Sequence, residues 1–184
     1  FINKQKDIKY SSIIFDEDIH RTLYDEKIDY TYLKWLEKEY GVPNLWPYLY
    51  IDRVVMNGQL LREYPYNSPL LSRDEMLRDV QVNAKAIIAF LEKEKPDAIV
   101  ISVIGSVAST MLYHIAKKKG IQTVNMEFAR IGNRIAFSED DMTFTWVKKR
   151  FDEIRKGRKS NQRESAQKFL DEFRNAPAPY DASY

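Results

Sequence analysis

The sequence predicts an α/β protein, a Rossmann-like three-layer domain in which a parallel sheet is flanked by helices. Three observations predict this class. The run AIVISVI (98–104) is continuous and β-branched, as in strands that are buried on both faces. A Gly-Ser turn leads directly from it into a helical pattern over 107–119, and a glycine separates this helix from a second apolar run at 121–126. Strand, helix and strand in this order form a βαβ unit, whose two strands should be parallel.

The first part of the chain alternates between short apolar runs and helical patterns. The run SIIF (12–15) predicts a strand, and the acidic residues 16–18 after it predict a loop. Apolar spacing over 24–40 predicts a helix that ends at Gly41. The loosely alternating segment 48–56 predicts a further strand.

Three more helices are predicted from capping residues and spacing. Ser72, with Glu75 three residues later, has the capping-box pattern, so a helix should begin there and continue to about Lys95. Two helices should follow the βαβ unit, over 141–156 and 163–175. The apolar stripe expected on the long helix consists of Leu77, Val80, Ala84, Ile87, Ile88 and Leu91.

Composition limits the classes of function. The 184 residues carry a net charge of only +2, which gives no electrostatic reason to expect nucleic-acid binding. There is no cysteine, and no apolar run reaches the roughly 20 residues that cross a bilayer. We expect one domain over 1–184. Since the chain starts at Phe1 without a methionine, we also expect it to be part of a longer protein.

Polar residues follow both strands of the βαβ unit at the point where each strand ends. In a parallel sheet these carboxyl ends meet at one edge, where ligands bind. The guanidinium group of an arginine can bind a phosphate or a sugar carboxylate through two hydrogen bonds. A glutamate can act as a general base or bind a sugar hydroxyl. The predicted catalytic residue here is Glu127. The predicted substrate-binding residues are Gly105, Ser106, Arg130, Asn133 and Arg134.

Each of these interpretations has a structural alternative. Gly105 and Ser106 offer backbone N–H groups to an anion, but they also form an ordinary helix cap. The pattern G-x-G-x-x-G is absent, so dinucleotide binding has little support. For Glu127 the alternative is an ion pair with one of the two nearby arginines.

The two histidines and the basic residues complete the candidates. His20 follows the acidic residues 16–18 and is predicted as a second catalytic residue, with a solvated loop as the alternative. His114 lies within a predicted helix and is expected to be structural. Two histidines are too few for an ordinary zinc site, and we expect neither a metal nor a cofactor. The basic segment 148–159 suits either an anionic membrane surface or a solvated helix face.

Segment 92–180 resembles the amino-terminal half of bacterial capsule and surface polysaccharide glycosyltransferases of the GT-B type. The resemblance rests on KPD (95–97) before the buried strand, the Gly-Ser turn, A-x-x-x-G-I (116–121) and R-I-x-N-R (130–134). The tail AQKFLDEFRNAPAPYD resembles the segment that leads to the second domain of that family.

The resemblance implies transfer of a sugar from a nucleotide sugar to a surface glycan. It implies that a carboxyl-terminal domain, not in this chain, binds the nucleotide, and that this chain is the acceptor-side half, inactive alone. The expected location is the cytoplasm, at the inner face of the membrane, with peripheral membrane contact. Two alternatives stay open: half of a nucleotide-sugar epimerase-like enzyme, and a non-catalytic α/β ligand-binding or receiver-like module.

Overall fold

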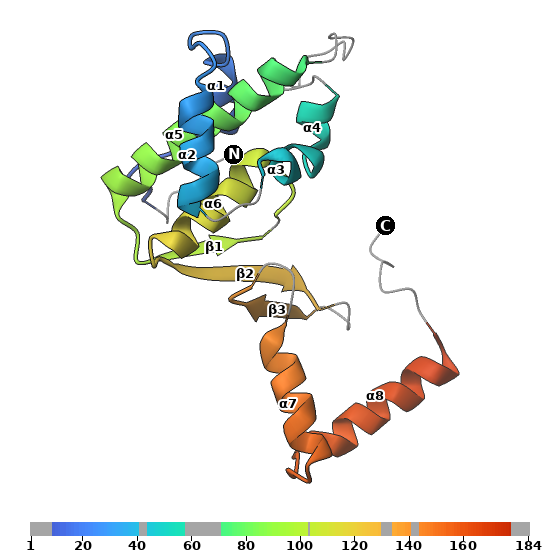
Figure 1. The fold of residues 1–184 in the computed structure, drawn as a ribbon. Coiled ribbons are helices and arrows are strands. Elements are labelled where there is room, and N and C mark those ends of the chain that lie inside the picture. The colour runs from blue at the N-terminus through green and yellow to red at the C-terminus, as the bar shows by residue number, and fades with distance from the viewer. Residues whose placement is uncertain are drawn as a thin grey trace. The chain divides into compact units, whose positions relative to one another are not determined.

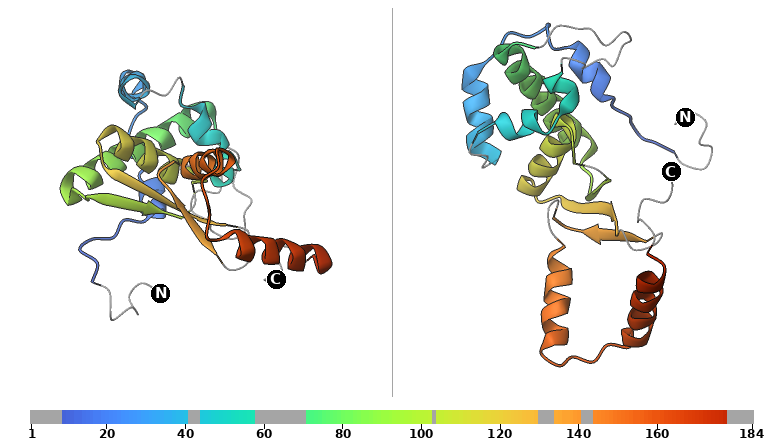
Figure 2. Two further views of the ribbon diagram at one scale, coloured as in Figure 1. Left: turned by 90° about the horizontal axis from the view of Figure 1, so that it is seen from below. Right: turned by 90° about the vertical axis from the view of Figure 1, so that its right-hand side faces the viewer.

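The computed structural model describes residues 9–40, 44–57, 71–102, 104–129, 134–140 and 144–177. Arg130 and Asn133 lie outside these ranges. Figures 1 and 2 show the described elements. In chain order they are α1 (Asp16–Arg21), α2 (Tyr30–Tyr40), α3 (Trp46–Tyr50), α4 (Arg53–Met56), α5 (Arg73–Glu94), β1 (Ala98–Ile101), α6 (Val107–Lys118), β2 (Gln122–Phe128), β3 (Ile135–Ser138), α7 (Thr145–Arg155) and α8 (Arg163–Asn175).

The predicted α/β class and the βαβ order are confirmed. β1 and β2 are parallel, and α6 joins them along the chain. The three strands that the structure describes form a mixed sheet in the order β1-β2-β3, because β3 pairs antiparallel with β2. The sheet is therefore smaller than predicted and is not purely parallel.

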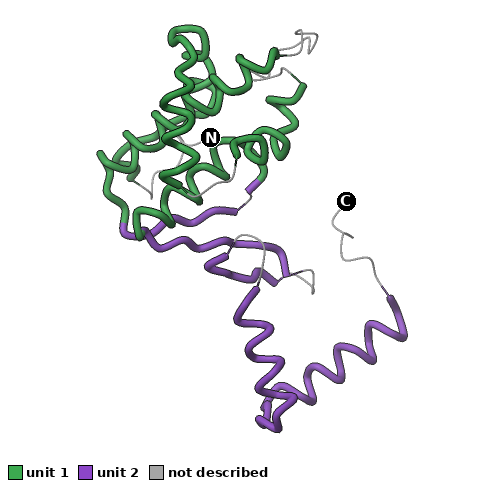
Figure 3. The backbone as a smooth tube through the Cα atoms, viewed as in Figure 1, with its two compact units in different colours: residues 1–96, 105–120 green, residues 97–104, 121–184 purple. Residues whose placement is uncertain are grey.

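The chain divides into two compact units (Figure 3). The first contains residues 1–96 and 105–120, and the second contains 97–104 and 121–184. In the first unit α5 packs against α1, α2, α3 and α6. The apolar stripe predicted on α5 is buried except at Ile88, which is half-buried.

Both ends of α5 were predictable from local signals. The Ser72 hydroxyl accepts a hydrogen bond from the Glu75 backbone N–H (3.3 Å), and the Glu75 carboxylate accepts one from the Ser72 N–H (2.7 Å). This reciprocal pair is the predicted capping box. Lys95 ends the helix in the left-handed conformation, with φ 47°, and Pro96 follows.

Two predicted strands are wrong. Residues 12–15 form no strand, and Ile13, Ile14 and Phe15 are 43–49% exposed. The acidic residues 16–18 are the first turn of α1 rather than a loop, where their charge interacts favourably with the helix dipole. Segment 48–56 contributes to the two short helices α3 and α4, because a proline suits the first turn of α3 and an aspartate caps α4.

The second unit contains the sheet and the last two helices. β1 ends at Ile101, and Val100 is 65% exposed, so the prediction of a strand buried on both faces is wrong. α7 begins at Thr145, and residues 141–143 of its predicted start lie outside the described ranges, while α8 matches the predicted range. Neither α7 nor α8 contains a buried residue.

Candidate functional site

The β2–β3 hairpin brings two of the predicted site residues together. Glu127 pairs with Ala136, and Ala129 N–H donates to the Arg134 carbonyl at 2.9 Å. Paired residues of a hairpin share a face, and every second residue of a strand does too. Glu127 and Arg134 therefore lie on one face, and both are exposed. Among the residues that the structure describes, neither side chain has a hydrogen bond or ion pair, so a Glu127–Arg134 ion pair is not formed. The alternative pair with Arg130 lies outside the described residues.

Glu127 is the last member of a polar row along β2. Thr123, Asn125 and Glu127 alternate on the same face, and the first two are buried. The Thr123 hydroxyl donates to the Glu139 carbonyl at 3.0 Å. Neither amide atom of Asn125 has a hydrogen-bond partner in the described part of the chain. An unpaired buried amide is costly, so the inner part of this row is polar without being fully bonded, and Glu127 is its exposed end.

The opposite face of β2 is apolar after its first residue, Gln122. Val124 and Met126 are half-buried and Phe128 is 82% exposed. The strand thus has the reverse of the usual pattern, with polar residues inside and apolar residues outside. This reversal concentrates hydrogen-bonding groups on the face that carries Glu127.

The Gly105-Ser106 turn is a completed helix cap. Ser109 Oγ accepts from the Gly105 and Ser106 N–H groups at 3.2 and 3.0 Å. Ser106 Oγ accepts from the Ser109 N–H at 3.1 Å. The Val107 N–H donates to Asp52 Oδ2 at 2.9 Å. The capping alternative is therefore confirmed, and an anion at this turn would compete with a protein carboxylate. A substrate-binding role for Gly105 and Ser106 stays a prediction.

His20 is buried in α1 and paired with an aspartate that sequence reasoning missed. Its Nδ1 lies 2.7 Å from Oδ1 of Asp79, which is fully buried in α5. The solvated-loop alternative for His20 is therefore wrong. Asn83 Nδ2 donates to the Asp79 backbone carbonyl at 2.9 Å. Within the described ranges, Asp79 Oδ2 and Asn83 Oδ1 have no partner.

The pKa shifts of this pair have the same sign. Burial by itself would lower the pKa of His20, but the hydrogen bond and the negative charge of Asp79 outweigh it and raise the pKa. Asp16 and Asp52 add to this effect. Burial raises the pKa of Asp79, and His20 offsets only part of that rise. The folded pair thus holds a proton more tightly than the unfolded chain does.

We expect the stability of the protein to fall as the pH rises above 6.5, the ordinary pKa of histidine. A raised folded-state pKa stabilises the native state below the unfolded pKa, and this stabilisation is lost as the pH rises through the folded value. Urea unfolding between pH 5.5 and 9 measures the effect. His20→Gln should remove the His20 part of the slope. An identical pH slope in wild type and His20→Gln would contradict the assignment.

One sequence signal could have revealed that Asp79 and Asn83 are buried, although not that His20 is the partner of Asp79. Asp79 and Asn83 are four residues apart on α5, directly beside the apolar stripe residues Val80 and Ala84. A polar row next to an apolar stripe on a long helix indicates buried polar groups. Asn125 gave no comparable signal, and Asp52 gave only that of a helix cap.

The described residues contain neither a cluster of metal-ligating side chains nor a helix long and apolar enough to cross a membrane. The class defined by fold and site is an α/β protein with a small mixed sheet and a polar row that ends in an exposed carboxylate. No family model, curated protein or solved structure matches the chain.

Proposed function

We propose that this chain is the acceptor-side domain of a glycosyltransferase that moves a sugar from a nucleotide sugar to a surface glycan. In this proposal the βαβ unit belongs to a Rossmann-like three-layer arrangement of the GT-B type. The observation that carries the proposal is the polar row of β2, which ends in the exposed side chain of Glu127 on the same face as Arg134. The resemblance of segment 92–180 supplies the reaction class.

The roles follow from the chemistry of these groups. The acceptor hydroxyl gives its proton to Glu127 while its oxygen forms a bond to the anomeric carbon. The bond from that carbon to the nucleotide phosphate breaks, and the phosphate leaves with the electron pair. Arg134 holds an anionic group of the acceptor. Arg130 and Asn133 keep their predicted substrate-binding roles. His20 has no part here, because its burial against Asp79 favours a structural role.

The nucleotide sugar is bound by a second domain outside this chain. We place the protein in the cytoplasm, at the inner face of the membrane. Support for peripheral membrane contact comes from α7, where the basic residues Lys148 and Lys149 lie among exposed apolar residues. These exposed apolar residues are Val147, Phe151 and Ile154.

The test is binding of surface-polysaccharide oligosaccharides to the chain, measured by saturation-transfer NMR. We expect Glu127→Gln and Arg134→Ala each to weaken binding about 10-fold, the effect of losing one hydrogen bond to a charged group. Both side chains are exposed, so the melting temperature should not change. Glu164→Gln, an exposed carboxylate in the first turn of α8, is the matched control.

Other outcomes of this experiment would contradict the proposal. Oligosaccharide binding that is insensitive to both substitutions would remove Glu127 and Arg134 from the site. Tight binding of a nucleotide sugar to the chain alone would favour the epimerase-like alternative. Magnesium-dependent phosphorylation by a small phosphodonor would favour the receiver-like one.

A further inference from the structure

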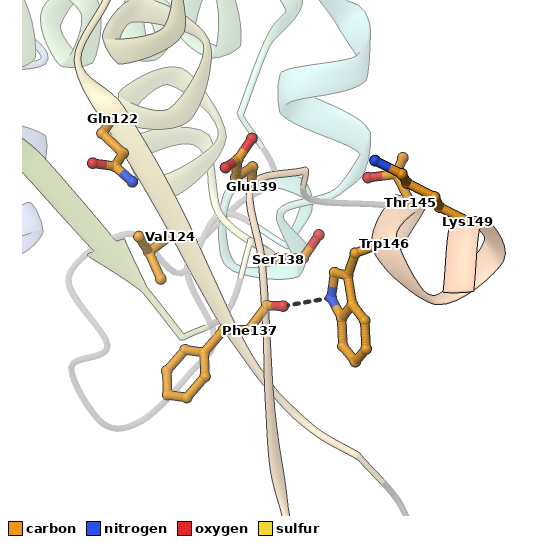
Figure 4. A pocket seen from close by; sticks show the side chains of 8 residues that line it. All are labelled: Gln122, Val124, Phe137, Ser138, Glu139, Thr145, Trp146 and Lys149. Carbon is orange, nitrogen blue, oxygen red and sulfur yellow. Dashed lines mark hydrogen bonds between the residues drawn. The ribbon is translucent and has the colours of Figure 1, made fainter. Parts of the chain in front are cut away.

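A pocket of about 460 Å³ lies on the second unit, at the junction of β2, β3 and α7 (Figure 4). Such a volume lies within the range of small-ligand sites. Val124 belongs to the apolar face of β2, and Phe137 pairs with Met126 of that face. Val124 and Phe137 therefore belong to the sheet face opposite Glu127, whereas Ser138, which pairs with Asn125, belongs to the Glu127 face. Its lining consists of Gln122, Val124, Phe137, Ser138, Glu139, Thr145, Trp146 and Lys149.

An indole ring forms one wall of the pocket. Trp146 Nε1 donates to the backbone carbonyl of Phe137 at 2.9 Å, drawn as the dashed line in Figure 4. This bond fixes the ring at the first turn of α7, yet the residue is still 52% exposed. Phe137 is 54% exposed. The pocket thus has a held, open aromatic surface, the Trp146 indole, which can take up the apolar face of a ligand, while the Phe137 ring points away from it in Figure 4.

Polar side chains complete the lining. Gln122, Glu139, Thr145 and Lys149 are all exposed. In the parts of the chain that the structure describes, none of the four uses its side chain in a hydrogen bond or ion pair. Together they offer an amide, a hydroxyl, a carboxylate and an ammonium group, which donate to and accept from hydroxyl groups. One acidic and one basic residue leave the lining without net charge.

We infer that this pocket binds a neutral pyranose ring of a glycan. The apolar C–H face of the sugar stacks on Trp146, and its hydroxyl groups bond to Gln122, Glu139 and Thr145. The absence of net charge disfavours a phosphate or a sulfate, for which Glu139 would be repulsive. The choice of a sugar over another polar ring rests on the proposed function. This second site, beside the β2–β3 hairpin that carries Glu127, would hold a more distant residue of the same glycan.

The experiment follows the indole N–H signals of the full chain by NMR during titration with methyl glycosides of neutral hexoses and N-acetylhexosamines. The sequence has three tryptophans, and the Trp146 signal is the one that Trp146→Phe removes. We expect a saturable shift of that signal alone, with a dissociation constant in the millimolar range. Glu139→Ala should weaken binding about 5-fold without unfolding, because only its backbone carbonyl is bonded.

Three control variants separate stacking of the sugar on Trp146 from a structural effect of losing the tryptophan. Trp146→Phe keeps an aromatic ring and loses only the bond to Phe137, so it should retain binding detected by saturation transfer, whereas Trp146→Ala should abolish it. Trp35→Phe, in α2 of the first unit, should have no effect. No shift with any glycoside, an equal shift of all three indoles, or a stronger response to a free nucleoside would overturn the inference.

The two proposals fail separately. Glu127→Gln should leave the glycoside shift of Trp146 unchanged. If glycosides do not shift the Trp146 signal but Glu127→Gln still weakens oligosaccharide binding, only the pocket proposal is overturned. The reverse result would overturn only the proposed function.

Discussion

Asp79→Ala is expected to lower the free energy of unfolding by about 3 kcal/mol, because it leaves a buried histidine without its partner. Asp79 is fully buried, and its Oδ1 lies 2.7 Å from His20 Nδ1. The substitution also leaves a cavity between α5 and α1, which pack against each other. Urea unfolding followed by tryptophan fluorescence measures the loss, since Trp35 and Trp46 report on the first unit.

Two further variants isolate the cause. Asp79→Asn keeps an oxygen that can accept from the imidazole N–H, so we expect it to cost less than the alanine, about 1 kcal/mol. Glu92→Ala removes a 62% exposed carboxylate from the same helix and should cost less than about 0.5 kcal/mol. A loss below about 1 kcal/mol for Asp79→Ala would show that the buried pair contributes little to stability.

The elements that could be predicted are those with their own local signals. The long helix α5 has a capping box at Ser72 and a proline after its end. α6 has a serine cap, and Gly120, with φ 73°, follows it in a conformation that glycine adopts readily. Such signals act within a few residues, so they do not depend on the rest of the fold.

The wrong predictions concern short apolar runs. Residues 12–15 and 48–56 are too short for periodicity to separate strand from helix, and tertiary contacts decide between them. Two local signals indicated helices rather than a strand in 48–56, namely the proline at the start of α3 and Asp52 as the cap of α4. β3 was missed, although the Gly132-Asn133 pair is typical of a turn between two strands.

The candidate site was predictable only where its residues are close in the sequence. That Glu127 and Arg134 lie close in space follows from strand-end reasoning, although an antiparallel hairpin rather than a parallel edge brings them to one face. The His20–Asp79 pair joins residues 59 positions apart, and no local pattern specifies such a contact. Long-range pairs of this kind require the packing of α1 on α5 to be known first.

Asp52→Ala is expected to cost about 2–3 kcal/mol, because this one carboxylate caps two helices. Its Oδ1 accepts from the Val54 and Val55 N–H groups of α4 at 2.9 and 3.2 Å, and its Oδ2 accepts from the Val107 N–H of α6 at 2.9 Å. Asp52 is 4% exposed, so water does not readily replace the lost bonds. The alanine leaves three backbone donors without an acceptor.

Asp29→Ala is the matched control for this prediction. Asp29 also caps a helix through one oxygen, which accepts from the Thr31 and Tyr32 N–H groups at 2.9 and 3.0 Å, but Asp29 is exposed and its carboxylate bonds only to α2. Asp29→Ala should lower the free energy of unfolding by about 1 kcal/mol, the typical loss for a single local helix cap. The difference between the two losses in urea unfolding reflects the bond from Asp52 to the start of α6 together with the burial of Asp52. Faster amide exchange in the first turn of α6 should accompany it in Asp52→Ala alone. Equal losses for the two variants would mean that Asp52 acts only as the local cap of α4.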